Sequence, residues 1–449
     1  HHPDGTVKAR YEVDARGRKH GRYLALDPDG TVRLRADYRA GELHGGYSVY
    51  GPGGKLELSA HYRGGVLHGA YRTYHPNGKP HVTAAYRDGR RHGKYGEQGP
   101  AGEPLVTAAY RDGRLHGWRT VYRGRRRPAS RQVWNDGRLR ELNGITPYPE
   151  ELPAMRRTLL EILGSEEEVS IGLQREALWT APLQDRPKQE RLAIALKRLK
   201  AYRYLAGVPW KDLELDAQLC RYAEAGARLC ERVGRLSHTP PNPGLPAAEY
   251  RFGRTGTLNC NLSGGGPVEY SVDGYMNDSD PTNIGRLGHR GWCLSPRMLR
   301  TGFGYGSRFS AMWATDTGRG RVPDYDFVAF PPRGYAPVEF FGPDYAWSVF
   351  LNPTRFSKPT SVAVRVRVFP LDEQLAPAPT PLEIDAFKVV PEASGIPWLI
   401  VFRPGGIELR PESRYWVEIR GLESRKAKRA GALTYLVEFC RVSRPEPAD

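Results

Sequence analysis

Histidine is distributed very unevenly along this chain of 449 residues. Ten of its twelve histidines lie in the first 145 residues, and only His238 and His289 lie in the remaining 304. Imidazole serves as a general acid or base and is the commonest metal ligand in proteins, so an isolated pair could do either kind of chemistry. The structural alternative is that each ring satisfies a hydrogen bond in its own loop. Which of these roles applies depends on whether the surrounding helices and strands bring the two histidines together.

Helical patterns surround this pair. Apolar residues recur at helical spacing over residues 188–210, and a second such stripe, with Asp212 as its expected cap, leads directly to His238. A third helix is expected over residues 267–278. The segment RTGFGYGSRFSAMWATD, which follows His289, reads as two strands. The region is therefore expected to mix helices with a small sheet.

The order of these elements resembles the CAP superfamily, the group of cysteine-rich secretory, antigen 5 and pathogenesis-related proteins. The resemblance rests on a helix ending in LSH, the loop NCNLSGG, the helix VDGYMND and, after an insertion, HRGWCLSPRMLRTGFGYG. It covers about residues 190–335. It implies an α-β-α sandwich, in which an antiparallel sheet lies between helical layers.

The same resemblance implies a central cleft with two histidines and two acidic residues, which in some family members bind a divalent metal. His238 matches the first histidine, His289 the second, and Asp278 one of the acids. Cys260, in NCNLS, stands where the family has the other acid. The implied metal ligands are therefore His238, Asp278 and His289, in a cleft that also contains Cys260. Thiolate, imidazole and carboxylate all suit zinc, so a divalent metal such as zinc is the expected cofactor.

Two functions are compatible with this cleft. The first is a non-enzymatic binding protein that uses the cleft for a ligand or a divalent metal. The second is a cysteine-dependent hydrolase, with Cys260 as nucleophile, His238 or His289 as base and Asp278 orienting the base. The structural alternative for Cys260 is a small apolar core residue. We expect the binding protein, with no catalytic residues, because the family rarely shows clear catalysis.

The first third of the chain repeats with a period of 24 residues. Each unit reads as two strands joined by Gly-containing turns, as in GGYSVYG, PGGK and LELSAHYR. Stacked units predict a long antiparallel meander in which each unit buries its face on its neighbours. Equivalent positions lie about 9.6 Å apart, too far for neighbouring histidines to share one ion. Each imidazole of the repeat is therefore expected to hydrogen-bond to the following turn: His20, His44, His68, His92 and His116.

This pattern, Y-x-x-G-x-x-H-G-x-Y, resembles the bacterial variant of the MORN repeat over residues 5–142. The resemblance implies a binding or scaffolding sheet. Residues 1–145 carry 27 Lys and Arg against 14 Asp and Glu, a net charge of 27 − 14 = +13 out of +17 for the whole chain. We therefore expect the sheet to contact a protein or an anionic surface. The alternative is an ordinary solvated basic face, because the arginines are spread regularly.

The remaining sequence completes a multidomain organisation. Residues 143–187 read as a linker with a short helix near 155–163, residues 188–335 as the CAP-like domain, and residues 336–449 as a β-sandwich accessory domain. Six strand-like segments support the last of these: YAWSVFLNP, SVAVRVRVF, LEIDAFKVV, WLIVFRP, RYWVEIRG and LTYLVEFCRV.

Composition excludes several classes of protein. The sequence contains no run of 18 apolar residues that could span a membrane, and no nucleotide-binding signature. Nucleic acid is not an expected partner, because the short basic run GRRRP lacks interleaved aromatic residues. The sequence opens with HHPDGTVKAR and no methionine, so we expect a processed form or a fragment. For the multidomain binding protein we expect an extracytoplasmic or secreted location.

Overall fold

The computed structural model describes residues 1–124, 127–174, 186–425 and 429–443. The chain divides into two compact units. The first comprises His1–Pro147 with Asp372–Pro377, and the second comprises Tyr148–Leu371 with Ala378–Asp449. Part of the expected linker, residues 175–185, lies outside the described residues.

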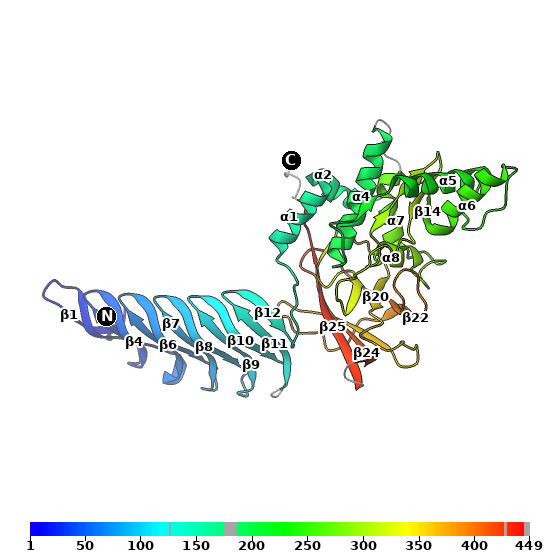
Figure 1. Cartoon of the computed structure of the whole chain (residues 1–449). Helices are drawn as coiled ribbons and strands as arrows, with labels where there is room; N and C mark the ends of the chain where they lie inside the picture. The colour runs from blue at the N-terminus through cyan, green and yellow to red at the C-terminus, as the bar shows by residue number, and fades with distance from the viewer. Residues whose placement is uncertain (125–126, 175–185, 426–428, 444–449) are drawn as a thin grey trace. The chain divides into compact units, whose positions relative to one another are not determined.

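The first unit is a single antiparallel sheet of twelve strands in which every strand pairs with its neighbours in sequence. Figure 1 shows the repeated hairpins from β1 to β12. The predicted meander of two-strand units is confirmed. Its strands are β1 Ala9–Val13, β2 Lys19–Leu26, β3 Val32–Arg39, β4 Glu42–Tyr50, β5 Leu56–Arg63, β6 Val66–Tyr74, β7 Pro80–Arg87, β8 Arg90–Gln98, β9 Pro104–Arg111, β10 Arg114–Tyr122, β11 Pro128–Asn135 and β12 Arg138–Leu142, with a short 3-10 helix η1 at Pro52–Gly54.

A tyrosine and alanine ladder explains the 24-residue period. Tyr47 pairs with Ala60, and Ala60 pairs in turn with Tyr71, so large and small side chains alternate across the sheet. Tyr47 also meets Tyr62 edge to face, with ring centroids 5.5 Å apart. Such cross-strand contacts stabilise a sheet locally, which allows each repeat to form from its own sequence and its neighbour's.

The five histidines that recur every 24 residues hydrogen-bond to the following turn, as expected. Nδ1 of His68 lies 3.4 Å from the backbone nitrogen of Asp88 and 3.2 Å from its carboxylate, in the following turn. His92 and Asp112 repeat both contacts. The imidazoles of the other three repeats accept the same turn hydrogen bond, from Ala40 to His20, from Gly64 to His44 and from Asp136 to His116.

The second unit begins with helices. They are α1 Leu152–Leu163, α2 Glu166–Ser170, η2 Ile171–Gln174, α4 Lys188–Leu205, α5 Ala217–Val233, α6 Ala247–Asn259, η3 Val268–Tyr270, α7 Ser271–Asn277 and α8 Gly288–Cys293. The expected cap Asp212 is wrong: Asp216 caps α5 by accepting hydrogen bonds from the backbone nitrogens of Gln218 and Leu219. Asp212 instead pairs with Arg319. The expected helix over 267–278 is shorter than predicted, since its first turn is the 3-10 helix η3.

A small antiparallel sheet lies against α5. Its order is β14 (Cys260–Gly264), β17 (Phe309–Trp313) and β16 (Phe303–Tyr305), and a parallel pair is formed by β13 (Glu214–Leu215) and β15 (Arg300–Thr301). The glycines of TGFGYG permit this packing. A Cβ on Gly304 would lie 2.1 Å from the backbone nitrogen of Glu224, and one on Gly302 would lie 2.3 Å from that of Cys220.

Replacing Gly304 by alanine is therefore expected to lower the free energy of unfolding by about 1–3 kcal/mol, because the added methyl group would overlap the α5 backbone. The measurement is the urea midpoint of the full chain. Gly320→Ala is the matched control, since a Cβ there meets nothing within 4 Å. Equal midpoints for the two variants would show that α5 can shift away from the sheet at little cost.

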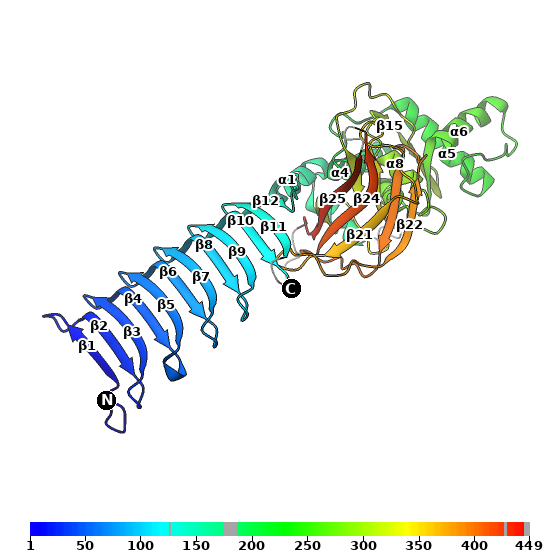
Figure 2. The same cartoon turned by 90° about the horizontal axis from the view of Figure 1, so that it is seen from below.

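The C-terminal region contains two four-stranded sheets. Their orders are β18-β20-β23-β22 and β19-β25-β24-β21, and strands of the second lie side by side in Figure 2. All six expected strand segments are present, and β18 and β19 add two more. The strands are β18 Phe327–Phe330, β19 Gly334–Pro337, β20 Trp347–Leu351, β21 Arg365–Pro370, β22 Ile384–Val390, β23 Leu399–Pro404, β24 Arg414–Ser424 and β25 Arg429–Cys440. Their buried residues share one hydrophobic core with α4, α7 and α8.

Candidate functional site

Three of the four predicted cleft residues line one pocket. His238 follows α5, Cys260 begins β14, and His289 lies in α8, yet all three border the same cavity of about 250 Å³. Asp278, which ends α7, lies behind His289 with its carboxylate fully buried. The other lining residues are Leu258, Asn259, Asn261, Asn283, Arg286, Gly288, Trp292, Ala314, Thr315 and Ser394.

Asp278 orients His289. Its Oδ1 lies 2.8 Å from Nδ1 of the His289 ring, and its Oδ2 accepts hydrogen bonds from the backbone nitrogens of His289 and Arg290, at 2.9 and 3.3 Å. The carboxylate thereby satisfies N–H groups in the first turn of α8, which have no partner within the helix. Asp278 itself adopts the left-handed conformation, with φ of 44°, which short polar side chains tolerate best after glycine. The contact leaves Nε2 of His289 without a partner among the described residues.

His238 is held in the same way by a backbone carbonyl. Its Nδ1 lies 2.7 Å from the carbonyl oxygen of Thr257, whose hydroxyl donates back to the carbonyl of His238 at 3.1 Å. A carbonyl only accepts, so Nδ1 carries the proton and the neutral ring has an unprotonated Nε2. Both imidazoles of the pocket are thus fixed through Nδ1, with Nε2 left for a ligand.

Cys260 has an apolar environment. Its side chain is 3% exposed and packs with Ala227, Cys230 and Ala311. Burial raises the pKa of the Cys260 thiol well above its ordinary value, and the neighbouring Cys230 adds to the rise. No hydrogen bond joins this thiol to either imidazole in the part of the chain that the structure describes. This environment favours the structural interpretation of Cys260.

Arg290, next to His289, connects the site to neighbouring segments through its buried side chain. Its guanidinium is fully buried and donates to backbone carbonyls and to two hydroxyls, namely the carbonyls of Met276, Asn277 and Ala346 and the hydroxyls of Ser348 and Ser279. Burial lowers the pKa of Arg290 to about 10. Sequence reasoning indicates a hydrogen-bonding role for Arg290 beside His289 but does not identify its partners, because Ala346 and Ser348 lie more than fifty residues away.

The arrangement does not fit the metal tetrad that the sequence resemblance implies. Both oxygens of Asp278 already accept hydrogen bonds from His289 and Arg290, and the Cys260 thiol is held protonated. Over the described ranges no group of three or more His, Cys, Asp or Glu side chains is placed to hold a metal ion. Zinc ligation by His238, Asp278 and His289 stays a prediction.

The fold and site define a multidomain protein with a repeat sheet, a mixed α and β region with a polar pocket, and a β-rich C-terminal region. Comparisons of the sequence with protein-family models and with curated proteins return no match. No helix within the described residues is long and apolar enough to cross a membrane. The function must be argued from this chain's own residues.

Proposed function

We propose that the chain is a non-enzymatic binding protein whose pocket between His238 and His289 holds a small hydroxylated anion of the sugar-acid type. The observation that carries the proposal is that both imidazoles are fixed in the same way, through a hydrogen bond of Nδ1. Each is fixed through Nδ1, by Thr257 or by Asp278. In the neutral state each then has an Nε2 lone pair to accept a hydrogen bond from a ligand hydroxyl.

The rest of the lining supports a negatively charged and hydroxylated ligand. Arg286 is exposed at the pocket, and its guanidinium donates to the side-chain oxygen of Asn283 rather than to a carboxylate. No Asp or Glu is among the described lining residues. Trp292 adds an aromatic surface, and several amide groups add polar contacts. An anionic group would meet Arg286 while hydroxyls meet the imidazoles.

Gluconate is the probe that tests this proposal, by calorimetric titration of the full chain. Glucose lacks the charge and hexanoate lacks the hydroxyls, so both are expected to bind at least about tenfold more weakly than gluconate. Arg286→Gln is expected to weaken gluconate binding by about the same factor. Arg251→Gln removes another exposed arginine, on α6, and should change nothing. Absence of saturable gluconate binding, or binding of glucose or hexanoate as tight as that of gluconate, would overturn the proposal.

The hydrolase alternative has one observation in its favour. The hydrogen bond from His289 to Asp278 is the contact between base and orienting group that such a mechanism needs. Cys260 is a poorly supported nucleophile, however, because burial raises the pKa of its thiol well above the ordinary value. The binding function is therefore the better supported of the two, and its CAP-like character rests on the resemblance in sequence.

For the repeat sheet, MORN-like in sequence, we propose contact with an anionic surface. Exposed arginines recur every 24 residues at Arg39, Arg63, Arg87 and Arg111, although Arg63 and Arg87 each pair with an aspartate of the next turn. The full chain is expected to co-sediment with vesicles of anionic lipid at low salt and to be released at 0.5 M salt, on the order of three times the physiological level, by screening. Vesicles of neutral lipid are the control. Equal sedimentation with both vesicle types would contradict an electrostatic contact.

A further inference from the structure

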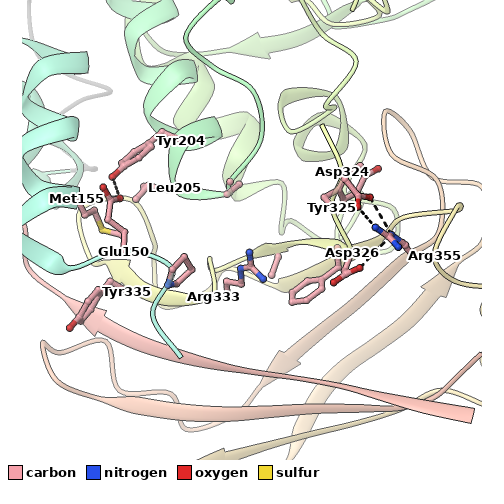
Figure 3. A pocket seen from close by; sticks show the side chains of 15 residues that line it. Glu150, Met155, Tyr204, Leu205, Asp324, Tyr325, Asp326, Arg333, Tyr335 and Arg355 are labelled. Atoms are coloured by element: carbon pink, nitrogen blue, oxygen red, sulfur yellow. Dashed lines mark hydrogen bonds and ion pairs between the residues drawn. The ribbon is translucent and has the colours of Figure 1, made fainter. Parts of the chain in front are cut away.

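A second cavity, of about 300 Å³, lies in the second unit away from the two histidines. Four stretches of chain surround it: the residues before and within α1, the end of α4, the segment from Asp324 to Tyr335, and Arg355. Figure 3 shows the labelled side chains around this cavity. None of its lining residues belongs to the pocket of His238 and His289.

Charges of both signs border this cavity, and one of them, the cation of Arg333, is not neutralised by the others. Among the described residues Arg333 has no carboxylate within ion-pair distance, and its guanidinium lies 5.8 Å from the centre of the Phe327 ring. In Figure 3 the Arg333 side chain lies between Glu150 and Asp326. Arg333 is therefore a cation without an anionic partner at the border of the cavity.

The carboxylates are held in place by other groups. One oxygen of Glu150 accepts a hydrogen bond from the hydroxyl of Tyr204. Burial and this contact raise the pKa of Tyr204, so the phenol stays a donor. Arg355 pairs with Asp324 and, at 3.7 Å, with Asp326. Glu150 retains one oxygen without a partner in the described chain, and Asp326 has only the longer contact.

The remaining lining is apolar. Met155, Leu205 and Ala329 contribute aliphatic surface, and Phe327 and Tyr335 contribute aromatic surface. At about 30 Å³ for each water-sized group, the cavity has room for roughly ten such groups. This matches a small molecule with a charged end of each sign and an apolar side chain.

We propose that this cavity binds a free amino acid with an apolar side chain. The carboxylate of the ligand pairs with Arg333, its ammonium group pairs with Glu150, and its side chain lies against Met155, Leu205 and Phe327. A ligand with only a negative charge would be repelled by the carboxylates of the cavity. A ligand with only a positive charge would be repelled by Arg333. A zwitterion satisfies both signs of charge.

L-leucine is the probe, titrated calorimetrically into the full chain. N-acetyl-L-leucine lacks the ammonium group and L-leucinamide lacks the carboxylate, so each is expected to bind at least about tenfold more weakly than leucine. Arg333→Gln should abolish the preference for leucine over leucinamide. Glu150→Gln should abolish the preference for leucine over N-acetyl-L-leucine. Each variant removes the group that the proposal pairs with the missing charge.

The control is Arg321→Gln, which removes an exposed arginine three residues before Asp324 in sequence and outside the cavity lining. It should bind leucine like the unchanged chain. Gluconate should not displace leucine, because the two ligands are proposed to bind in different pockets. The leucine proposal and the gluconate proposal can therefore fail independently. Absence of saturable leucine binding, equal binding of leucine and leucinamide, or unchanged preferences in Arg333→Gln would each overturn the proposal.

Discussion

Arg290→Met is expected to lower the free energy of unfolding by about 3 kcal/mol, because it removes the buried guanidinium that donates to three backbone carbonyls and two hydroxyls. The loss is moderated by relief of the desolvation that lowers the pKa of Arg290 to about 10. Those carbonyls belong to α7 and to the approach to β20, so their hydrogen bonds tie the pocket region to the C-terminal sheets. The measurement is the urea midpoint of the full chain, followed by tryptophan fluorescence.

Arg286→Met is the matched control for this experiment. Arg286 lies four residues earlier, is exposed, and hydrogen-bonds only to Asn283 in the described chain. Its replacement is expected to change the free energy of unfolding by less than about 0.5 kcal/mol. If Arg290→Met unfolds at the same urea concentration as the control, the hydrogen bonds of Arg290 contribute little to the free energy of unfolding and the prediction is wrong.

Cys260 is expected to react with iodoacetamide at least about a hundredfold more slowly in the folded chain than in urea. The thiolate is the reactive form, and each unit by which a pKa is raised removes nine tenths of it. Burial raises the pKa of Cys260 well above its ordinary value, so the folded thiol stays protonated at neutral and mildly alkaline pH. A change from pH 7 to pH 8.5 should speed the reaction in urea and leave the folded rate low.

Mass spectrometry of each cysteine after timed labelling measures this rate. Cys220 is the internal reference, because it is the one cysteine of the five, all of them described, that is half-buried rather than buried. Fast labelling of Cys260 in the folded chain would restore the cysteine hydrolase as a serious candidate. Slow labelling would leave the Asp278–His289 pair without a nucleophile and support the binding function.

The repeat sheet was predictable because its contacts are local. A hairpin pairs residues that are close in sequence, so the 24-residue step of His, Gly and Tyr carries the strand order directly. The six C-terminal segments were predictable as strands from their short spacing between Pro-rich turns and, in SVAVRVRVF, from alternation at period two. Their pairing was not, since β19 pairs in parallel with β25, about a hundred residues later.

The cap of α5 shows where local reasoning is ambiguous. Asp212 and Asp216 both precede the apolar stripe, and sequence alone preferred the wrong one. Asp212 is used by Arg319, a residue more than a hundred positions away, while Asp216 meets the first turn of the helix. Only the path of the chain between them decides which carboxylate reaches the free N–H groups.

By itself the sequence determined the period of the sheet, the strands of the C-terminal region, and the two histidines that belong to one pocket. Tertiary structure decided the state of the site: Asp278 serves His289, Cys260 is enclosed in apolar contacts, and Arg290 joins the pocket region to β20. It also decided the cavity around Arg333, whose lining comes from four separate stretches. Charge, protonation and hydrogen-bonding capacity depend on neighbours in space, and no spacing along the chain specifies which distant side chains those neighbours are.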